Sequence, residues 1–192
     1  MADIFPNALI KIENDMKSRI LKFEILGIVF ILVFGSLLHF TFNWLNWVWP
    51  VGAFSAVNES TWEHLKLAVV PAIVWAILES KVFKLKVNNF LFAKAAGTYL
   101  MPILIVVLFY LYKAILGYNL LVFDISTFVI AVIIGQIASY KIMLHREFSG
   151  KLDIIWILLL MVLFLAFVIF TFYPPHKFLF QDPVSGLYGV IK

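Results

Sequence analysis

The sequence contains no cysteine. This absence excludes disulfide bonds, thiolate nucleophiles and cysteine-ligated metal sites. Charged residues are also scarce, because they make up 14% of the 192 residues whereas 64% are hydrophobic. A soluble domain carries about a quarter charged residues, and most of the apolar runs in this chain lack the polar stripe of a soluble amphipathic helix. The composition therefore excludes an ordinary soluble protein.

The chain contains several apolar runs that reach the roughly 20 residues needed to cross a bilayer as a helix. These runs predict an all-α fold, a polytopic transmembrane helical bundle that forms one membrane domain over residues 1–192. We expect five spans, at residues 24–46, 59–79, 91–112, 120–140 and 152–173. Residues 1–22 are expected to form a cytoplasmic amphipathic segment, with a frayed basic tail as the alternative. Residues 174–192 are expected to form a tail that folds back over the outer face.

The distribution of lysine and arginine predicts the orientation. Eleven of the fifteen basic residues lie on the N-terminal side of the membrane if there are five spans. They are Lys11, Lys17, Arg19, Lys22, Lys81, Lys84, Lys86, Lys94, Lys141, Arg146 and Lys151. Because basic loops stay in the cytoplasm, we expect the N-terminus inside and the C-terminus outside. The net charge of +4 is then an orientation signal, and the expected partner is the lipid bilayer rather than a nucleic acid.

Polar residues concentrate in one stretch, NESTWEHLK at residues 58–66. Its candidate functional residues are Asn58, Glu59, Glu63 and His64. Part of the stretch is typical of a helix start, since Ser60 and Glu63 have the spacing of a capping box and Glu63 can pair with Lys66. A helix start explains His64 and Glu59 less well, so these two residues indicate a further role.

The predicted orientation brings more polar residues to the same face. His39 lies late in the first span, Asp124 lies early in the fourth, and His176 and Asp182 follow the fifth. Ionisable groups at membrane depth are costly unless they pair or face a polar cavity. We therefore expect an outward-facing polar pocket that these residues form together with residues 58–66. For His39, a hydrogen bond to a backbone carbonyl of a neighbouring helix is the alternative.

Such a pocket suits a divalent metal such as zinc, because imidazole and carboxylate groups are its usual ligands. The expected ligands are His39, His64 and His176. The expected catalytic bases are Glu59 and Asp124. The expected binding residues are Asn58, Glu63 and Asp182. The leading hypothesis is a metal-dependent membrane hydrolase that acts on an amphiphilic or lipid-like substrate at the outer leaflet.

Other chemistries remain open. Ser60 and His64 are four residues apart and could form a serine–histidine pair, with Asp124 or Asp182 to orient the imidazole. The same groups could instead hold a small-molecule ligand in a non-catalytic solute-binding or transport component. In a third alternative, the polar cluster only stabilises the bundle of a structural partner subunit.

Two motifs resemble a known group of sequences. The stretch NESTWEHLKL, the histidine late in the preceding span and the terminal segment YPPH…LF.DPVSG.YG together resemble a family of small, uncharacterised multi-spanning proteins of bacteria and archaea. The resemblance covers most of the chain, implies a multi-pass protein of the cell membrane and transfers no activity. The gathering of histidines and acids is also similar to that in intramembrane zinc hydrolases of the ceramidase and progestin-receptor type. This chain lacks their late-helix paired histidines and has fewer spans, so that likeness is an analogy.

Overall fold

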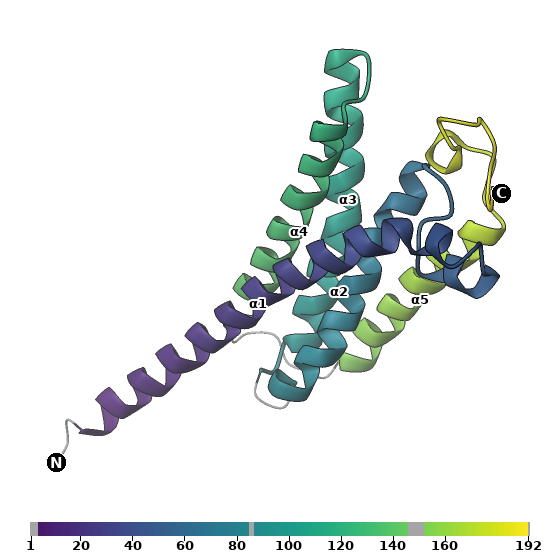
Figure 1. The fold of residues 1–192 in the computed structure, drawn as a ribbon. Coiled ribbons are helices and arrows are strands. Elements are labelled where there is room, and N and C mark those ends of the chain that lie inside the picture. Colours follow the sequence, from purple (N-terminus) through teal and green to yellow (C-terminus); the bar gives the residue numbers. More distant parts are fainter. Residues whose placement is uncertain (1–3, 85–86, 146–151, 192) are drawn as a thin grey trace.

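The computed structural model describes residues 4–84, 87–145 and 152–191, with the backbone alone for residues 4–10. Within these ranges the chain forms five α-helices and no named strand (Figure 1). The helices are α1 (Ile4–Trp44), α2 (Thr61–Phe83), α3 (Phe90–Leu116), α4 (Leu121–Leu144) and α5 (Asp153–Phe172). Two short 3-10 helices, η1 (Trp49–Ala53) and η3 (Phe178–Phe180), lie in the connection after α1 and in the C-terminal tail. The predicted all-α bundle is confirmed.

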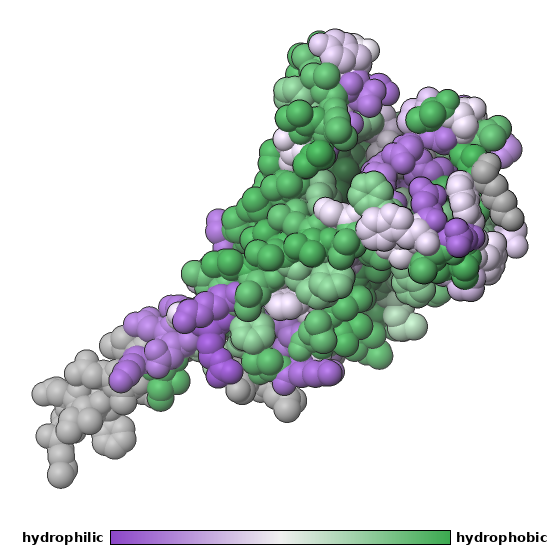
Figure 2. Space-filling view, viewed as in Figure 1, coloured by the Kyte–Doolittle hydropathy of each residue, from purple (hydrophilic) through white to green (hydrophobic). Residues whose placement is uncertain are grey.

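Four of the helices in the described part of the chain are long and apolar enough to cross a membrane. They are Lys11–Trp44 of α1, Phe90–Leu116, Leu121–Leu144 and Asp153–Phe172. The space-filling view shows hydrophobic residues over most of the visible surface of the bundle, with hydrophilic residues toward its ends (Figure 2). The chain is therefore a membrane protein. Helix α2 corresponds to the predicted second span but is not among the four, so its crossing of the membrane stays a prediction.

Helix α1 differs from the prediction for the N-terminus. It is continuous from Ile4 to Trp44, so the amphipathic segment predicted for residues 1–22 is not a separate helix (Figure 1). Residues 1–3 of that segment lie outside the described residues. At 1.5 Å per residue its 41 residues span about 60 Å, roughly twice the thickness of the hydrocarbon core of a bilayer. The hydrophilic first half of the helix has room to extend beyond the membrane.

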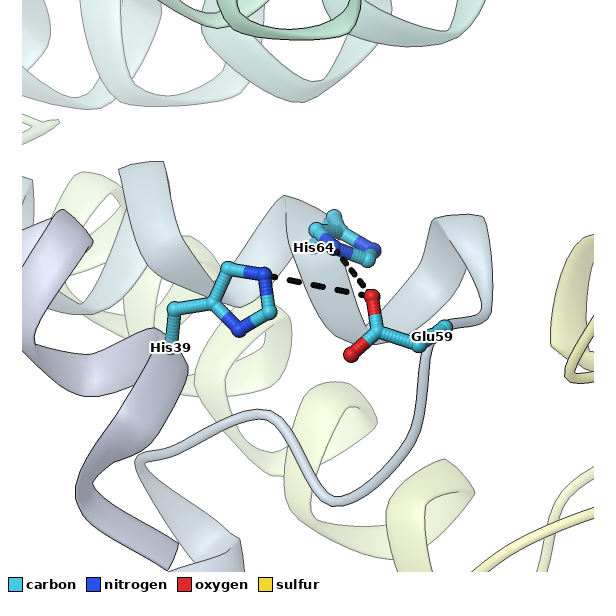
Figure 3. Close-up of side chains that lie close together, drawn as sticks. All are labelled: His39, Glu59 and His64. Carbon is cyan, nitrogen blue, oxygen red and sulfur yellow. Dashed lines mark ion pairs between the residues drawn. The ribbon is translucent and has the colours of Figure 1, made fainter. Parts of the chain in front are cut away.

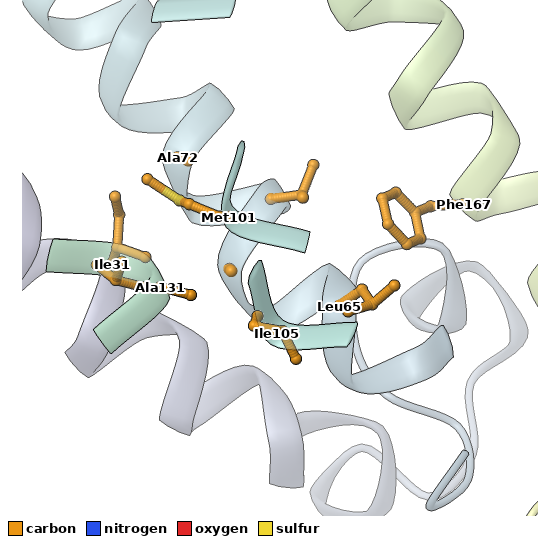
Figure 4. Close-up of a cluster of buried hydrophobic side chains, with 10 residues drawn as sticks. Ile31, Leu65, Ala72, Met101, Ile105, Ala131 and Phe167 are labelled. Carbon is orange, nitrogen blue, oxygen red and sulfur yellow. The ribbon is translucent and has the colours of Figure 1, made fainter. Parts of the chain in front are cut away.

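The centre of the bundle is a cluster of buried apolar side chains to which every helix contributes (Figure 4). The cluster consists of Ile31, Leu65, Ala68, Val69, Ala72, Met101, Ile105, Ala131, Val132 and Phe167. Helix α2 provides four of these residues and packs against α1, α3 and α5. Helices associate in lipid through close van der Waals packing rather than through hydrophobic burial. Helix α2 is accordingly in contact with three of the four other helices.

The crossing of α1 and α2 places two histidines opposite one another. A Cβ atom at Gly35 would overlap the backbone carbonyl of Leu67, so the two helix backbones touch at this point. Small residues allow such close approach between membrane helices. Gly35 lies one turn before His39, and Leu67 lies three residues after His64. The contact therefore fixes the distance between the two imidazole rings.

The connection between α1 and α2 is tied to the end of α1 by a buried serine. The Ser55 hydroxyl accepts a hydrogen bond from the backbone N–H of Phe42 at 3.0 Å and donates one to the carbonyl of Leu38. Ser55 has no exposed surface. Because this contact lies beside His39 in the sequence, the connection returns along α1 and carries Glu59 toward that histidine.

Two lysines used for the orientation prediction are not loop residues. Lys94, counted with a cytoplasmic loop, lies on α3 and is 3% exposed. Lys66, counted on the other side, is fully buried in α2. Without these two residues, an arrangement with five spans would still place most of the basic residues on the N-terminal side. Lys86, Arg146 and Lys151 of the predicted loops lie outside the described residues.

Candidate functional site

Three side chains with metal-ligating atoms meet where α1 ends and α2 begins (Figure 3). His39 comes from α1, His64 from the first turn of α2, and Glu59 from the connection just before α2. The Oε2 atom of Glu59 lies 3.9 Å from Nε2 of His39 and 3.4 Å from Nε2 of His64. In the part of the chain that the structure describes, this is the one group of three such ligands within 4.8 Å of one another.

The start of α2 holds Glu59 in place. Ser60 is the N-cap, and its hydroxyl accepts a hydrogen bond from the backbone N–H of Glu63 at 3.4 Å. The backbone N–H of Ser60 donates to Oδ1 of Asn58 at 2.8 Å. Glu59 lies between these two anchored residues, outside the helix, so its side chain is free to reach the histidines. The predicted capping role of Ser60 is thus observed, although the Glu63 side chain does not return to Ser60.

The tautomer of His64 follows from its backbone contact. Its Nδ1 atom lies 2.9 Å from the carbonyl oxygen of Ser60. A carbonyl oxygen only accepts hydrogen bonds, so Nδ1 carries the proton and Nε2 of the neutral ring has a free electron pair. Nε2 faces a carboxylate oxygen of Glu59, to which it donates a hydrogen bond when the ring is protonated. Two electron-pair donors at this distance require a proton or a metal cation between them.

The same contact excludes the serine–histidine pair. The Ser60 hydroxyl is occupied at the helix N-cap, and His64 binds the carbonyl of Ser60 rather than its hydroxyl. Ser60 is also 1% exposed. A serine nucleophile has to be within hydrogen-bond reach of its base, and this geometry does not provide that contact.

The cluster is open on one side, and its carboxylate is ionised. The side chains of His39, Glu59 and His64 are 30%, 50% and 34% exposed. The hydrogen bond from His64 lowers the pKa of Glu59, and this effect together with the charges of the two histidines outweighs the opposing effect of partial burial. Glu59 is therefore ionised at neutral pH, as a carboxylate metal ligand must be.

The distances from Glu59 to the two histidines suit a small divalent ion. Zinc binds nitrogen and oxygen ligands at about 2.0–2.2 Å in a tetrahedron, which separates neighbouring ligand atoms by about 3.4 Å. The Glu59–His64 distance of 3.4 Å matches this value, and the Glu59–His39 distance of 3.9 Å is somewhat wider. Three protein ligands and an open fourth position are typical of catalytic rather than structural zinc sites.

Two residues predicted for the pocket lie elsewhere. Asp124, at the start of α4, accepts a hydrogen bond from the hydroxyl of Tyr112 on α3. His176, in the C-terminal tail, stacks on Tyr188 with a ring-centroid distance of 4.6 Å. His176 also lines a cavity of about 620 Å³ that has aromatic walls and that none of the three clustered side chains lines. The structure therefore brings neither Asp124 nor His176 to the cluster.

The C-terminal tail folds back onto the start of α2. The side-chain amide of Asn58 donates to the carbonyl of Gly189 at 2.7 Å, so both ends of this side chain are occupied by backbone groups. The ring of Trp62 packs on Phe180 with centroids 4.8 Å apart. Asn58 thus fastens the tail beside the cluster rather than pointing toward it.

Asp182 also holds the tail in place through hydrogen bonds. It is 5% exposed. Its carboxylate accepts from the backbone N–H groups of Val184 at 3.2 Å and Ser185 at 3.1 Å, and also from that of Glu59. Burial raises the pKa of Asp182, but the hydrogen bonds outweigh it and hold the pKa below its usual value. The ionised carboxylate joins the tail to the backbone of a cluster residue.

Glu63 belongs to a buried ionic network. The predicted pair is confirmed, since Lys66 Nζ lies 2.6 Å from Glu63 Oε2 and both side chains are at most 2% exposed. Lys66 also donates to the carbonyl of Gly52 at 2.8 Å and to the hydroxyl of Thr171 at 2.7 Å. Glu63 accepts from Thr171 as well, at 2.8 Å. Thr171 was not singled out from the sequence, where its only signal is a hydroxyl group near the end of an apolar helix.

Comparison with known proteins gives one match. A family model described as a family of unknown function (DUF6512) matches residues 12–190. No curated protein and no solved structure matches the chain. The match covers the whole cluster and the tail segment that lies beside it.

Proposed function

The chain belongs to the DUF6512 family of unknown function, and from its geometry we propose that it is a membrane protein that binds one divalent metal ion of the zinc class. The ligands are His39, Glu59 and His64. The observation that carries this proposal is the position of one Glu59 oxygen within 3.4 and 3.9 Å of two imidazole nitrogens. Such a cluster needs a positive species at its centre, and a divalent ion satisfies all three groups at once.

The exposed side of the cluster would leave one position of the metal ion free for a water molecule. A metal ion with one free position lowers the pKa of a bound water to about 7 and so provides a nucleophile at neutral pH. We propose hydrolysis of an amphiphilic or lipid-like substrate as the reaction of this nucleophile. In its support, His39 stacks on Phe40 with a centroid distance of 4.8 Å, and Phe40 in turn stacks on Trp44. Both aromatic side chains are exposed, so an apolar surface lies directly beside the polar cluster.

A second candidate function is solute binding without catalysis, as in a transport component. The cavity beside the tail supports it, because small molecules bind in concave surfaces that combine apolar walls with polar groups. The cavity of about 620 Å³ is lined by Trp49, Phe172, Tyr188 and the imidazole of His176, among others. A small molecule that co-purifies with the protein and lies in this cavity would favour binding over hydrolysis.

We propose that the cluster faces the outside of the cell membrane, with the N-terminus in the cytoplasm. The excess of basic residues on the N-terminal side supports this orientation. A cysteine introduced by Ser185→Cys would be the only thiol in the chain, since the sequence contains no other. We expect a membrane-impermeant maleimide to label it in intact cells. Labelling only after permeabilisation would contradict the proposed orientation.

Metal analysis of the purified protein tests the proposed function. We expect about one equivalent of a divalent transition metal in protein purified without chelator, and its removal by a strong chelator should be reversible on addition of zinc. The expectation follows from a donor set of two imidazoles and a carboxylate. Protein that contains no metal and takes up none in a zinc titration would contradict the metal site and, with it, the hydrolase.

A further inference from the structure

Three ionisable side chains from three different helices meet inside the bundle, away from the cluster described above. Glu24 of α1 and Glu79 of α2 both form ion pairs with Lys94 of α3. The Oε2 atom of Glu79 lies 2.5 Å from Lys94 Nζ. None of the three residues is more than 3% exposed. Because both carboxylates contact the same nitrogen atom, they lie next to one another.

The charges in this group do not balance. Two carboxylates and one ammonium leave one net negative charge when all three are ionised. The other polar groups near the two carboxylates, among the described residues, are neutral. They are Trp75 on α2 and Gln136 and Ser139 on α4. A net charge enclosed in a membrane bundle is costly, and an extra proton is the simplest way to remove it.

Hydrogen bonding around Glu24 and Glu79 also indicates a missing proton. Glu24 Oε2 and Glu79 Oε1 are enclosed and accept no hydrogen bond of normal geometry, although the Trp75 indole N–H lies near Glu79. The Ser139 hydroxyl, which is fully buried, lies close to Glu24 but also lacks a well-formed hydrogen bond. A proton on one carboxyl group would remove the net charge and would supply an O–H donor to the adjacent carboxylate.

A glycine on α1 leaves space for the polar side chains that surround Glu24. Gly27 lies three residues after Glu24 on α1. A Cβ atom at Gly27 would overlap the side-chain amide of Gln136 and the indole of Trp75. Only a residue without a side chain allows polar groups of α2 and α4 to approach α1 here. The group is therefore an enclosed site built by four helices rather than a surface ion pair.

We propose that Glu24, Glu79 and Lys94 form a binding site for one proton, which the two carboxylates hold while α1, α2 and α3 are packed together. Separation of the helices at this level would admit water, ionise both carboxylates and release the proton. Opening of this end of the bundle is thereby linked to proton release. The site lies fifteen residues from His39 along α1 and from His64 along α2, about 22 Å, and it does not depend on the metal.

Infrared spectroscopy of the purified protein in lipid nanodiscs at neutral pH tests this site. We expect the carbonyl band of a protonated carboxylic acid, shifted by selective ¹³C labelling of glutamate. Glu24→Gln and Glu79→Gln should each remove the band without lowering the thermal midpoint, because the remaining carboxylate and Lys94 form a neutral pair. The double variant should have a much lower midpoint, since its Lys94 lacks a counter-ion. The matched control is Glu13→Gln on the exposed part of α1, where Glu13 pairs with Lys17, and it should leave the band unchanged.

Two results would overturn the proton site. The first is a wild-type spectrum without a glutamic acid band, which would show that both carboxylates are ionised. The second is a band that persists in both single variants, which would assign the proton to another residue. The wild-type spectrum with glutamate labelling requires no substituted protein, so the first result can be obtained even if a variant does not fold.

Discussion

His39→Ala and His64→Ala are each expected to abolish stoichiometric metal binding, whereas His176→Ala is expected to leave it unchanged. The two clustered histidines are direct ligands in the proposed site, while His176 stacks on Tyr188 in the tail. Loss of a group that only supports a ligand typically costs 10–100-fold in metal affinity, so loss of a ligand should cost more than about 100-fold. Metal content by mass spectrometry and zinc titration by calorimetry measure both effects.

His176→Ala is the informative control because the sequence alone predicts His176 as a third ligand. Equal loss of metal in all three variants would favour that ligand set and would require the tail to move toward the cluster. Unchanged metal binding in His64→Ala would show that His64 is not a ligand and only belongs to the start of α2. A further variant, Glu59→Gln, keeps the shape of the side chain and removes its charge, so it should weaken binding if the carboxylate is a ligand.

Lys66→Met is expected to lower the free energy of unfolding by about 3–5 kcal/mol, the usual cost of removing one partner from a buried ion pair. The substitution leaves the Glu63 carboxylate enclosed without its cation and deprives the Gly52 carbonyl of its donor. Equilibrium unfolding in mixed micelles measures the loss. The control is Lys81→Met on the same helix, where the side chain is exposed and the change should be small.

The double variant Glu63→Met/Lys66→Met separates pairing from packing. If the loss in Lys66→Met comes from an unpaired buried charge, removal of both charges should recover part of it. Recovery should be incomplete, because Glu63 also accepts hydrogen bonds from Val57 and Thr171. Equal stability of the Lys66→Met and Lys81→Met proteins would contradict the structural role of the network.

The sequence predicts the depth of a residue in a helical bundle better than its direction. Depth follows from the position of a residue within its predicted span, and together with the predicted orientation it puts His39 and His64 at one face. Direction depends on how each helix is rotated against its neighbours. Asp124 was predicted at a similar depth, yet on α4 it meets Tyr112 of the adjacent α3 instead of the histidines. Residue types and spacing contain no information on that rotation.

The buried ion pairs of Lys94 show a second limit of prediction from the sequence. Glu24 and Glu79 lie at the predicted ends of spans, and Lys94 lies near a run of basic loop residues. Each residue alone is typical of a membrane–water boundary, where charges are solvated. Their burial depends on the continuation of α1 beyond the predicted span and on the packing of α2 and α3 against it. A lysine inside an apolar run was the one available signal.

The contact between Gly35 and Leu67 gives the bundle a mechanical property. The two helix backbones touch there, so a change in their crossing angle would be a rotation about this contact. On α1, His39 lies four residues after Gly35, and Glu24 lies eleven residues before it. At a constant rise per residue, the acidic end moves about three times as far as the histidine end. A small movement of His39 on binding of the proposed metal ion would therefore produce a larger movement of Glu24.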